Sequence, residues 1–240
     1  MDKIAVLMEK LKEFDTPSVT NVVATYPGDK ELCLGLYNPW TCNWYTDESI
    51  KCMFPELGRT VGYAVTAVYE LFDPNFQRLS FKDVLEAVET SPKPCIFVMK
   101  QNMPDEIRKK NGLSGGNMTT ALQTLGCVGC ISDGPSRDLG EIRSMRFQYM
   151  LSGVTPGHGS FSVAAVNVPV SVGGMDVAPG DIIHMDENGA VKFPASQLEK
   201  VVELLEKLQE KESKIQAEMR KYKTAEDVMT AFKGETPASN

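Results

Sequence analysis

Residues 115–138, "GGNMTTALQTLGCVGCISDGPSRD", contain the pattern that decides the fold. A helix is expected from Asn117 to Gly126, because glycine is the residue type most favoured just beyond a helix C-terminus. The next run, residues 127–133, is short and apolar and ends in a turn signal, as a buried strand does. A second helix is expected to begin at Arg137-Asp138. The stretch therefore predicts a helix, a strand and another helix in succession.

The segments on its N-terminal side continue this alternation. "TVGYAVTAVYEL" (60–71) is rich in β-branched and aromatic residues and "PCIFVMK" (94–100) is a short apolar run, so both are predicted strands. Between them, "SFKDVLEAVE" (80–89) is a predicted helix, with Ser80 as its N-cap and Asp83 in the position of a capping box. Strands that alternate with helices indicate an α/β core with parallel strand pairing.

The segments around this core have a different character. One helix is expected within residues 2–14, and a second begins after an N-cap at Asp15 or Thr16. Residues 27–58 are rich in Pro, Trp, Tyr and Cys, which predicts an irregular excursion that packs aromatic side chains. After residue 150 the sequence predicts strands, including a hairpin that turns at Asn188-Gly189.

The C-terminal part is predicted to be one long charged helix, residues 196–232, followed by a disordered tail, residues 233–240. Residues 1–195 would then form a single domain. The helix has an apolar stripe that consists of Leu198, Val201, Leu205, Leu208, Ile215, Met219 and Tyr222. Such a stripe on a charged helix is typical of packing against the protein's own core or against a neighbouring subunit.

Composition narrows the classes of function. The chain has 240 residues, a net charge of -7 and a pI near 5.0, which argues against nucleic acid or an anionic membrane as a partner. It has no run of about 18 apolar residues, the length that a membrane span needs. The N-terminal residues are charged and amphipathic rather than signal-like, so a cytoplasmic protein is expected.

Cys127 and Cys130 form a CxxC motif within the predicted strand at 127–133. A structural zinc site needs four nitrogen or sulfur ligands, and the sequence has no second CxxC and only two histidines. Buried free thiols are therefore the expected state of this pair.

Two places could support chemistry. "SGGNMTT" (114–120) has paired glycines before a helix, where backbone N–H groups can bind an anion, although a tight turn with Asn117 as N-cap explains the same pattern. The second place is Arg137-Asp138. A salt bridge and a helix cap shared with Glu141 would explain it, but a guanidinium also matches a carboxylate ligand and an aspartate can hold Mg²⁺.

Both places come after the carboxyl ends of consecutive predicted strands, where open α/β sheets bind ligands. Anion-binding amides, Arg137 and Asp138 could therefore share one crevice. The pattern alone leaves open whether these residues are structural or functional.

Residues 115–138 together with "NVPVSVGGMDVAPGDIIHMDENGAVKFP" (167–194) resemble the RraA-like family, which includes the 4-hydroxy-4-methyl-2-oxoglutarate aldolases. The resemblance extends over about residues 110–197 and includes the glycine turn, the twenty-residue spacer and the Arg-Asp pair. It implies a swivelling-type β/β/α sandwich with N-terminal helices and a long C-terminal helix. It also implies a homotrimer or hexamer with sites at subunit interfaces. Residues 27–58 depart from the family pattern.

The resemblance implies a class II, metal-dependent pyruvate aldolase that acts on a small 2-oxo acid and also decarboxylates oxaloacetate. By carry-over from the family motif, the amides of Gly115, Gly116, Asn117 and Met118 would bind the pyruvyl carboxylate. Arg137 would contact the substrate and stabilise the enolate, and Asp138 would bind Mg²⁺ or Mn²⁺. Some family members have an acidic residue where this chain has Gly116, which leaves the proton relay open.

Three candidates for the general base stay open: Asp133, Glu141 and a metal-bound water. His158 is expected to be a solvated loop residue, and His184, inside a strand, a structural one. Two alternative functions remain as well. The chain could perform the same chemistry on a sugar-derived 2-oxo acid, or it could be a non-enzymatic regulator of an RNA-processing endonuclease, as other RraA-like proteins are.

Overall fold

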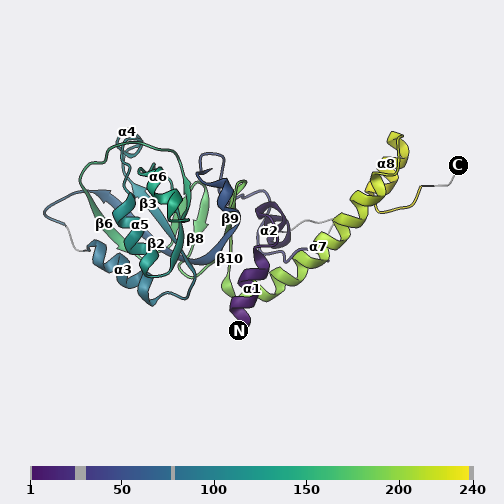
Figure 1. The fold of residues 1–240 in the computed structure, drawn as a ribbon, viewed down its shortest axis with the longest axis horizontal. Helices are drawn as coiled ribbons and strands as arrows, with labels where there is room; N and C mark the ends of the chain where they lie inside the picture. Colours follow the sequence, from purple (N-terminus) through teal and green to yellow (C-terminus); the bar gives the residue numbers. More distant parts are fainter. Residues whose placement is uncertain (1, 25–30, 77–78, 238–240) are drawn as a thin grey trace.

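The structure is a computed structural model that describes residues 2–24, 31–76 and 79–237. Its centre is an eight-stranded sheet in the order β1-β5-β4-β3-β2-β9-β10, with β6 also paired to β2 (Figure 1). The strands of this sheet are β1 Lys51–Cys52, β2 Thr60–Leu71, β3 Cys95–Asn102, β4 Cys127–Ser132, β5 Gln148–Leu151, β6 Phe161–Val166, β9 Ile182–Asp186 and β10 Gly189–Phe193. A separate two-stranded ribbon consists of β7 Val170–Val172 and β8 Met175–Val177.

The middle of the sheet is parallel, as the sequence predicts. Strands β2, β3, β4 and β5 are parallel neighbours. The helices between them are α3 Phe81–Thr90, α5 Gly116–Thr124 and α6 Leu139–Ser144, with the short α4 Asp105–Arg108 after β3. The capping box of Ser80 and Asp83 is present, and Gly126 has the positive φ of 87° that a residue beyond a helix end adopts. The α/β core is therefore confirmed.

The two faces of the sheet are covered by different elements. Successive side chains of a strand point to opposite faces. On β3, Phe97 packs in the same core cluster as residues of α3 and α5, whereas its neighbours Ile96 and Val98 pack with the β7–β8 ribbon. Figure 1 shows α3, α5 and α6 grouped against the sheet. The sheet thus has a helix face and a ribbon face.

The excursion at 27–58 packs aromatic side chains, as predicted, over the residues that the structure describes. Residues 25–30 lie outside the described part, and residues 31–58 contain β1 and one turn of 3-10 helix, Pro55–Leu57. Trp44 is buried and stacks on Tyr37, with ring centroids 5.4 Å apart. Strand β1 pairs with β5, so the excursion also extends the sheet at its edge.

Local hydrogen bonds explain where helix α2 begins and where the β9–β10 hairpin turns. Asp15, rather than Thr16, is the N-cap of α2 Thr16–Val23, because its carboxylate accepts the N–H of Ser18 at 2.9 Å. The predicted hairpin forms between β9 and β10, but its two turn residues lie one position earlier than predicted. The reason is that the Asp186 carboxylate accepts the N–H of Asn188 at 2.8 Å, which closes an Asx turn.

The prediction of a single helix over 196–232 is wrong. The structure has α7 Leu198–Met219, preceded by a 3-10 turn at Ala195–Gln197, and a separate α8 Ala225–Phe232. The Thr224 side chain accepts the N–H of Asp227 at 3.2 Å and donates to the Asp227 carboxylate at 2.6 Å. These two bonds cap a new helix, and they explain why the charged segment does not continue straight through. Of the predicted disordered tail, residues 233–237 are described and 238–240 are not.

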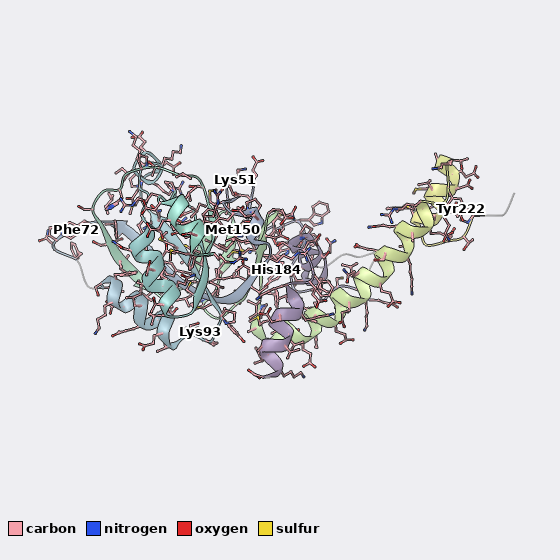
Figure 2. All side chains as sticks on the ribbon, viewed as in Figure 1. Lys51, Phe72, Lys93, Met150, His184 and Tyr222 are labelled. Carbon is pink, nitrogen blue, oxygen red and sulfur yellow. The ribbon has the colours of Figure 1, made fainter. Side chains whose placement is uncertain are left out.

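The two halves of α7 have different surroundings. Leu198, Val201 and Leu205 in its first half are buried and belong to the main core, against α2 and α1 Lys3–Leu11. The outer half and α8 extend away from the sheet (Figure 1), and Figure 2 shows Tyr222 far from the body of the molecule. Phe232 on α8 is 59% exposed. Within the described residues, no helix has both the length and the apolar character of a membrane span.

Candidate active site

The N-terminus of α5 and the turn after β4 come together on the helix face of the sheet. Gly115 is the N-cap of α5, and Ser114 accepts the N–H of Arg137 through its backbone carbonyl at 3.2 Å. A Cβ atom at Gly115 would lie 2.5 Å from Asp138 Oδ2 and 2.9 Å from Arg137 Nε. Only glycine allows this approach, so the paired glycines bring the helix N-terminus into contact with the Arg-Asp pair.

Asp138 does not cap its own helix. It adopts a left-handed conformation, with φ 60° and ψ 30°, and its side chain makes no capping hydrogen bond to α6. Instead, Asp138 Oδ2 accepts the N–H of Gly116 at 3.0 Å, at the N-terminus of α5. A non-glycine residue in this conformation costs on the order of 1 kcal/mol, and such strain tends to occur at functional sites. The helix-cap explanation of Asp138 is therefore wrong.

Arg137 is incompletely bonded. Its Nε lies 3.5 Å from Asp138 Oδ2, within ion-pair range, yet this buried Nε has no hydrogen-bond partner among the described residues. The Arg137 and Asp138 side chains are 36% and 38% exposed, so solvent or a ligand can reach both. A buried donor without an acceptor is destabilising, which makes Arg137 a natural position for an anionic ligand.

Glu141 lies closer to this centre than the sequence indicates. A Cβ atom at Gly116 would lie 2.3 Å from each of its carboxylate oxygens, so Glu141 fills the space that a side chain at position 116 would occupy. Glu141 is on the first turn of α6, three residues after Asp138. The space beside Gly116, where an acidic side chain at position 116 would lie, is thus filled by the Glu141 carboxylate from α6.

The other candidate base, Asp133, forms ion pairs and a hydrogen bond with residues outside the Arg137-Asp138 site. Its carboxylate lies 2.6 Å from Lys100 Nζ and 3.1 Å from Arg108 Nη1, and it accepts the N–H of Gln101 at 2.8 Å. Asp133 directly follows β4, and its partner Lys100 lies on β3 with the parity of Ile96 and Val98, which face the ribbon side of the sheet. It is therefore a buried structural carboxylate that points away from Arg137.

The two histidines form hydrogen bonds with residues other than Arg137 and Asp138. His158 is exposed, and its Nδ1 lies 3.0 Å from the Gly159 carbonyl oxygen. His184 is buried on β9 with Nδ1 2.9 Å from Thr16 Oγ1, and burial lowers its pKa to about 4. These placements agree with a solvated loop residue at 158 and a structural residue at 184.

Asn117 and Met118 complete the first turn of α5. The N–H groups of a helix's first turn have no partner within the helix, so they are available to an anion. The two side chains also line an adjoining pocket of about 380 Å³, with Tyr69 and Phe161 among its aromatic walls. The predicted anion-binding turn therefore opens beside a mainly apolar hollow.

A buried hydroxyl network holds the two turns in register, and no sequence pattern indicates it. Tyr149 Oη lies 2.6 Å from Ser114 Oγ and also contacts Thr119 Oγ1, and the Ser136 hydroxyl donates to the Ser114 carbonyl. Burial raises the pKa of Tyr149 to about 12, so it stays a neutral hydrogen-bonding group. Because Ser114 and Ser136 flank Gly115 and Arg137, this network positions the site.

The donor set fits a hard divalent cation. Among the described residues, no three His, Cys, Asp or Glu side chains form a cluster. Asp138 offers a carboxylate at the α5 N-terminus, which matches Mg²⁺, an ion that usually keeps several waters and takes only one or two protein carboxylates.

Comparisons with known proteins point to one family. The model of the RraA-like family, described as Aldolase/RraA, matches residues 41–192. An uncharacterised protein of Methanocaldococcus jannaschii is 30% identical over 48% of this chain and 56% of its own length. The Halalkalibacterium halodurans protein named "Putative 4-hydroxy-4-methyl-2-oxoglutarate aldolase" is 31% identical over 40% of this chain and 47% of its own. The chain thus spans about half the length of these curated relatives.

The fold has solved counterparts. The crystal structure of RraAS2 from Streptomyces coelicolor, described as an unusual member of the RNase ES inhibitor RraA protein family, superposes with a TM-score of 0.65. It is 20% identical, and the match covers 87% of this chain and 94% of that one. At this identity the likeness shows a shared fold, which agrees with the mixed α/β architecture and the long C-terminal helix.

Proposed function

Because this chain belongs to the RraA-like family, we propose that it is a divalent-metal-dependent class II aldolase. Its substrate would be a 4-hydroxy-2-oxo acid such as 4-hydroxy-4-methyl-2-oxoglutarate, cleaved to pyruvate, with oxaloacetate decarboxylation as a side activity. The observation that carries this proposal is the unpartnered Nε of Arg137 beside Asp138, which is itself held on the amide of Gly116. The name of the bacterial relative supports the same reaction.

Substrate binding would use the α5 N-terminus. The first-turn amides near Asn117 and Met118 and the positive end of the helix dipole favour the 2-oxo acid carboxylate. The Arg137 side chain is 36% exposed although its Nε is buried, so its terminal nitrogens would donate to the carbonyl oxygen that becomes the enolate. Asp138, fixed by the Gly116 amide, would hold the metal ion. When bound, Mg²⁺ or Mn²⁺ would act as a Lewis acid toward the 2-oxo acid.

Glu141 is the proposed base, since Asp133 faces the other side of the sheet. Its carboxylate would accept the proton of the C4 hydroxyl. The C3–C4 bond then breaks, its electron pair moves into the C2 carbonyl, and the C4 fragment leaves as a carbonyl compound. Arg137 holds the negative charge of the pyruvate enolate. Return of the proton to C3 gives pyruvate and restores the Glu141 carboxylate.

The decisive experiment is a pyruvate-release assay with a panel of 4-hydroxy-2-oxo acids. The panel should include 4-hydroxy-4-methyl-2-oxoglutarate, sugar-derived 2-oxo acids and oxaloacetate, each with and without Mg²⁺ or Mn²⁺. Metal-dependent release from at least one of them is expected, and the preferred acid separates the two aldolase alternatives. No release from any of these acids with either metal would overturn the proposal and favour a non-enzymatic role.

Glu141→Gln tests the assignment of the base. The amide keeps the size of the side chain but cannot accept the proton, so kcat should fall by about 10²-fold, the lower end for general bases because water can partly substitute. Oxaloacetate decarboxylation has no hydroxyl proton to remove, so that activity should change far less. Both rates are measured on the same preparation. An equal fall of both activities would contradict the base role and indicate that Glu141 mainly holds the metal.

We also propose that the outer half of α7 and α8 form an assembly surface in a homotrimer or hexamer. Two large apolar side chains of α8 are exposed: Met229 is 52% and Phe232 is 59% exposed. A monomer rarely extends such a helical arm into water, whereas a partner subunit would bury it.

Two truncations separate assembly from folding. Ending the chain after Gln216 removes the last residues of α7 and all of α8, with the exposed Met229 and Phe232, so the melting temperature should change little while the oligomeric state and activity fall together. Ending it after Pro194 also removes Leu198, Val201 and Leu205, which are buried in the core, and each lost side chain should cost about 2 kcal/mol or more of stability. Sedimentation and thermal melts measure both. An unchanged oligomer after the shorter truncation would contradict the assembly role.

A further inference from the structure

A second hollow lies on the ribbon face of the sheet, opposite Arg137 and Asp138. Its volume is about 730 Å³, within the usual range for small-molecule sites. Lys100 on β3 has the parity of Ile96 and Val98, and Asp133 forms an ion pair with it, so both side chains lie on this face. The β7–β8 turn and the end of β5 form the opposite wall.

The charge of this hollow is opposite to that of the chain. Four cations, Lys51, Lys100, Arg108 and Lys109, and two carboxylates, Asp47 and Asp133, line it, which leaves a local charge of +2. The whole chain carries -7, so these cations are concentrated here rather than distributed evenly. They come from three separate segments, β1, β3 and α4 with its C-cap, that only the fold brings together.

Asp133 forms ion pairs with two of the cations, Lys100 and Arg108. Its side chain is 7% exposed and accepts from Lys100 at 2.6 Å and from Arg108 at 3.1 Å. Lys100 and Arg108 remain 31% and 24% exposed, so a ligand can reach them. A buried carboxylate that fixes two cations makes a rigid site, because the long side chains lose their freedom before a ligand arrives.

The other two cations, Lys51 and Lys109, have no ion-pair partner among the described residues, and both are exposed. Figure 2 shows Lys51 on the upper side of the molecule. Clustered lysines without counter-ions repel each other, and a bound anion would relieve that repulsion.

The remaining walls suit a polar ligand of moderate size. Ser152 and Ser171 contribute hydroxyl side chains. Gly173 and Gly174, with φ of 53° and 76°, form the tight turn between β7 and β8 and expose backbone to the hollow. The volume of about 730 Å³ greatly exceeds that of one phosphate group, so an organic portion would fit beside the charged one.

We propose that this hollow, lined by Lys51, Lys100, Arg108 and Lys109, binds a small phosphate monoester. The local charge of +2 among the lining residues matches a phosphate dianion. Arg108 is held by Asp133 and, through Nη2, by Asp105 at 2.6 Å, so the exposed ammonium groups of Lys51 and Lys109 are the donors most open to phosphate oxygens. The site is separate from the proposed aldolase centre, since Arg137 and Asp138 do not line it.

Isothermal titration calorimetry on the full chain tests the site without any activity measurement. The probes are glycerol 3-phosphate, inorganic phosphate and uncharged glycerol. Binding of glycerol 3-phosphate is expected to be tighter than that of inorganic phosphate, and glycerol should not bind. Raising the ionic strength from about 0.05 M to about 0.5 M should weaken the interaction, because the charges are partly exposed.

Charge reversal locates the site. Lys51→Glu with Lys109→Glu should weaken glycerol 3-phosphate binding by at least about tenfold, while the matched pair Lys110→Glu with Lys223→Glu, which reverses two exposed lysines outside the hollow, should stay within about twofold. Arg137→Ala should leave binding unchanged. Equal losses in the two lysine pairs, loss of binding in Arg137→Ala, or no heat with glycerol 3-phosphate would each overturn the proposal.

Discussion

Asp138→Asn should abolish divalent-dependent pyruvate release while the fold stays intact. Asparagine keeps an oxygen that can accept the N–H of Gly116, now at 3.0 Å from Asp138 Oδ2, so the contact between the two turns survives. It removes the negative charge that a divalent cation needs from its carboxylate ligand. A fall of at least about 10³-fold in kcat/KM is expected, since both the Lewis acid and its alignment are lost.

A matched control and an independent readout separate loss of the metal from loss of the fold. Glu106→Gln removes one exposed carboxylate from α4, outside the proposed centre, and should leave activity and metal affinity unchanged. Manganese binding, followed by electron paramagnetic resonance, should be weakened in Asp138→Asn and not in the control. Full activity of Asp138→Asn, or wild-type activity in excess EDTA, would remove the basis for a class II mechanism.

The core of the fold could be predicted because its signals are local. Strand β2 begins and ends at the predicted residues, Thr60 and Leu71. Its β-branched and aromatic side chains favour a strand, and burial of the sheet fixes the register in which that strand pairs. The glycine turn and the Arg-Asp pair were also predicted to meet, because both come after neighbouring parallel strands. Their meeting is visible in the bond between the Gly116 amide and Asp138.

The errors arise where several local signals compete or where side chains act at a distance. The segment 196–232 has helical spacing throughout, and only the pairing of Thr224 with Asp227 shows that a new helix starts there. Asp138 followed by Glu141 resembles a cap in sequence, but the left-handed backbone of Asp138 turns its carboxylate to another helix. No sequence spacing relates Glu141 to Gly116, so the choice between the candidate bases required the fold.

The two proposed anion sites also differ in how much of each can be recognised in the sequence. Gly115, Gly116, Arg137 and Asp138 are close in sequence and form a recognisable pattern. Lys51 and Lys100 are single cations in their segments, and Arg108 begins a short basic run; only the fold brings these segments together. A single lysine at the end of a strand carries no signal, and clustering appears only once β1, β3 and α4 are placed.

Arg137→Ala should reduce retro-aldol cleavage and oxaloacetate decarboxylation together, by about 10³-fold each. Both reactions pass through the same pyruvate enolate, so a residue that stabilises its charge affects them equally, and the loss of one such donor typically costs 10² to 10³ in rate, roughly 3 to 4 kcal/mol. Arg137 is the only group at this centre with a buried, unpartnered donor among the described residues, which places its effect at the upper end.

Arg137→Lys distinguishes a donor fork from a simple positive charge. The lysine side chain has no group at the position of Nε, and its ammonium cannot bond two oxygens in one plane, so it should recover less than about tenfold of the lost rate. Ground-state binding should change less than turnover, since the interaction strengthens as charge develops on the carbonyl oxygen. Steady-state kcat and KM for both substrates provide the measurement. A lysine variant with wild-type kcat would show that Arg137 acts only as a counter-ion to Asp138, and unequal losses in the two reactions would show that it does not act on their common enolate.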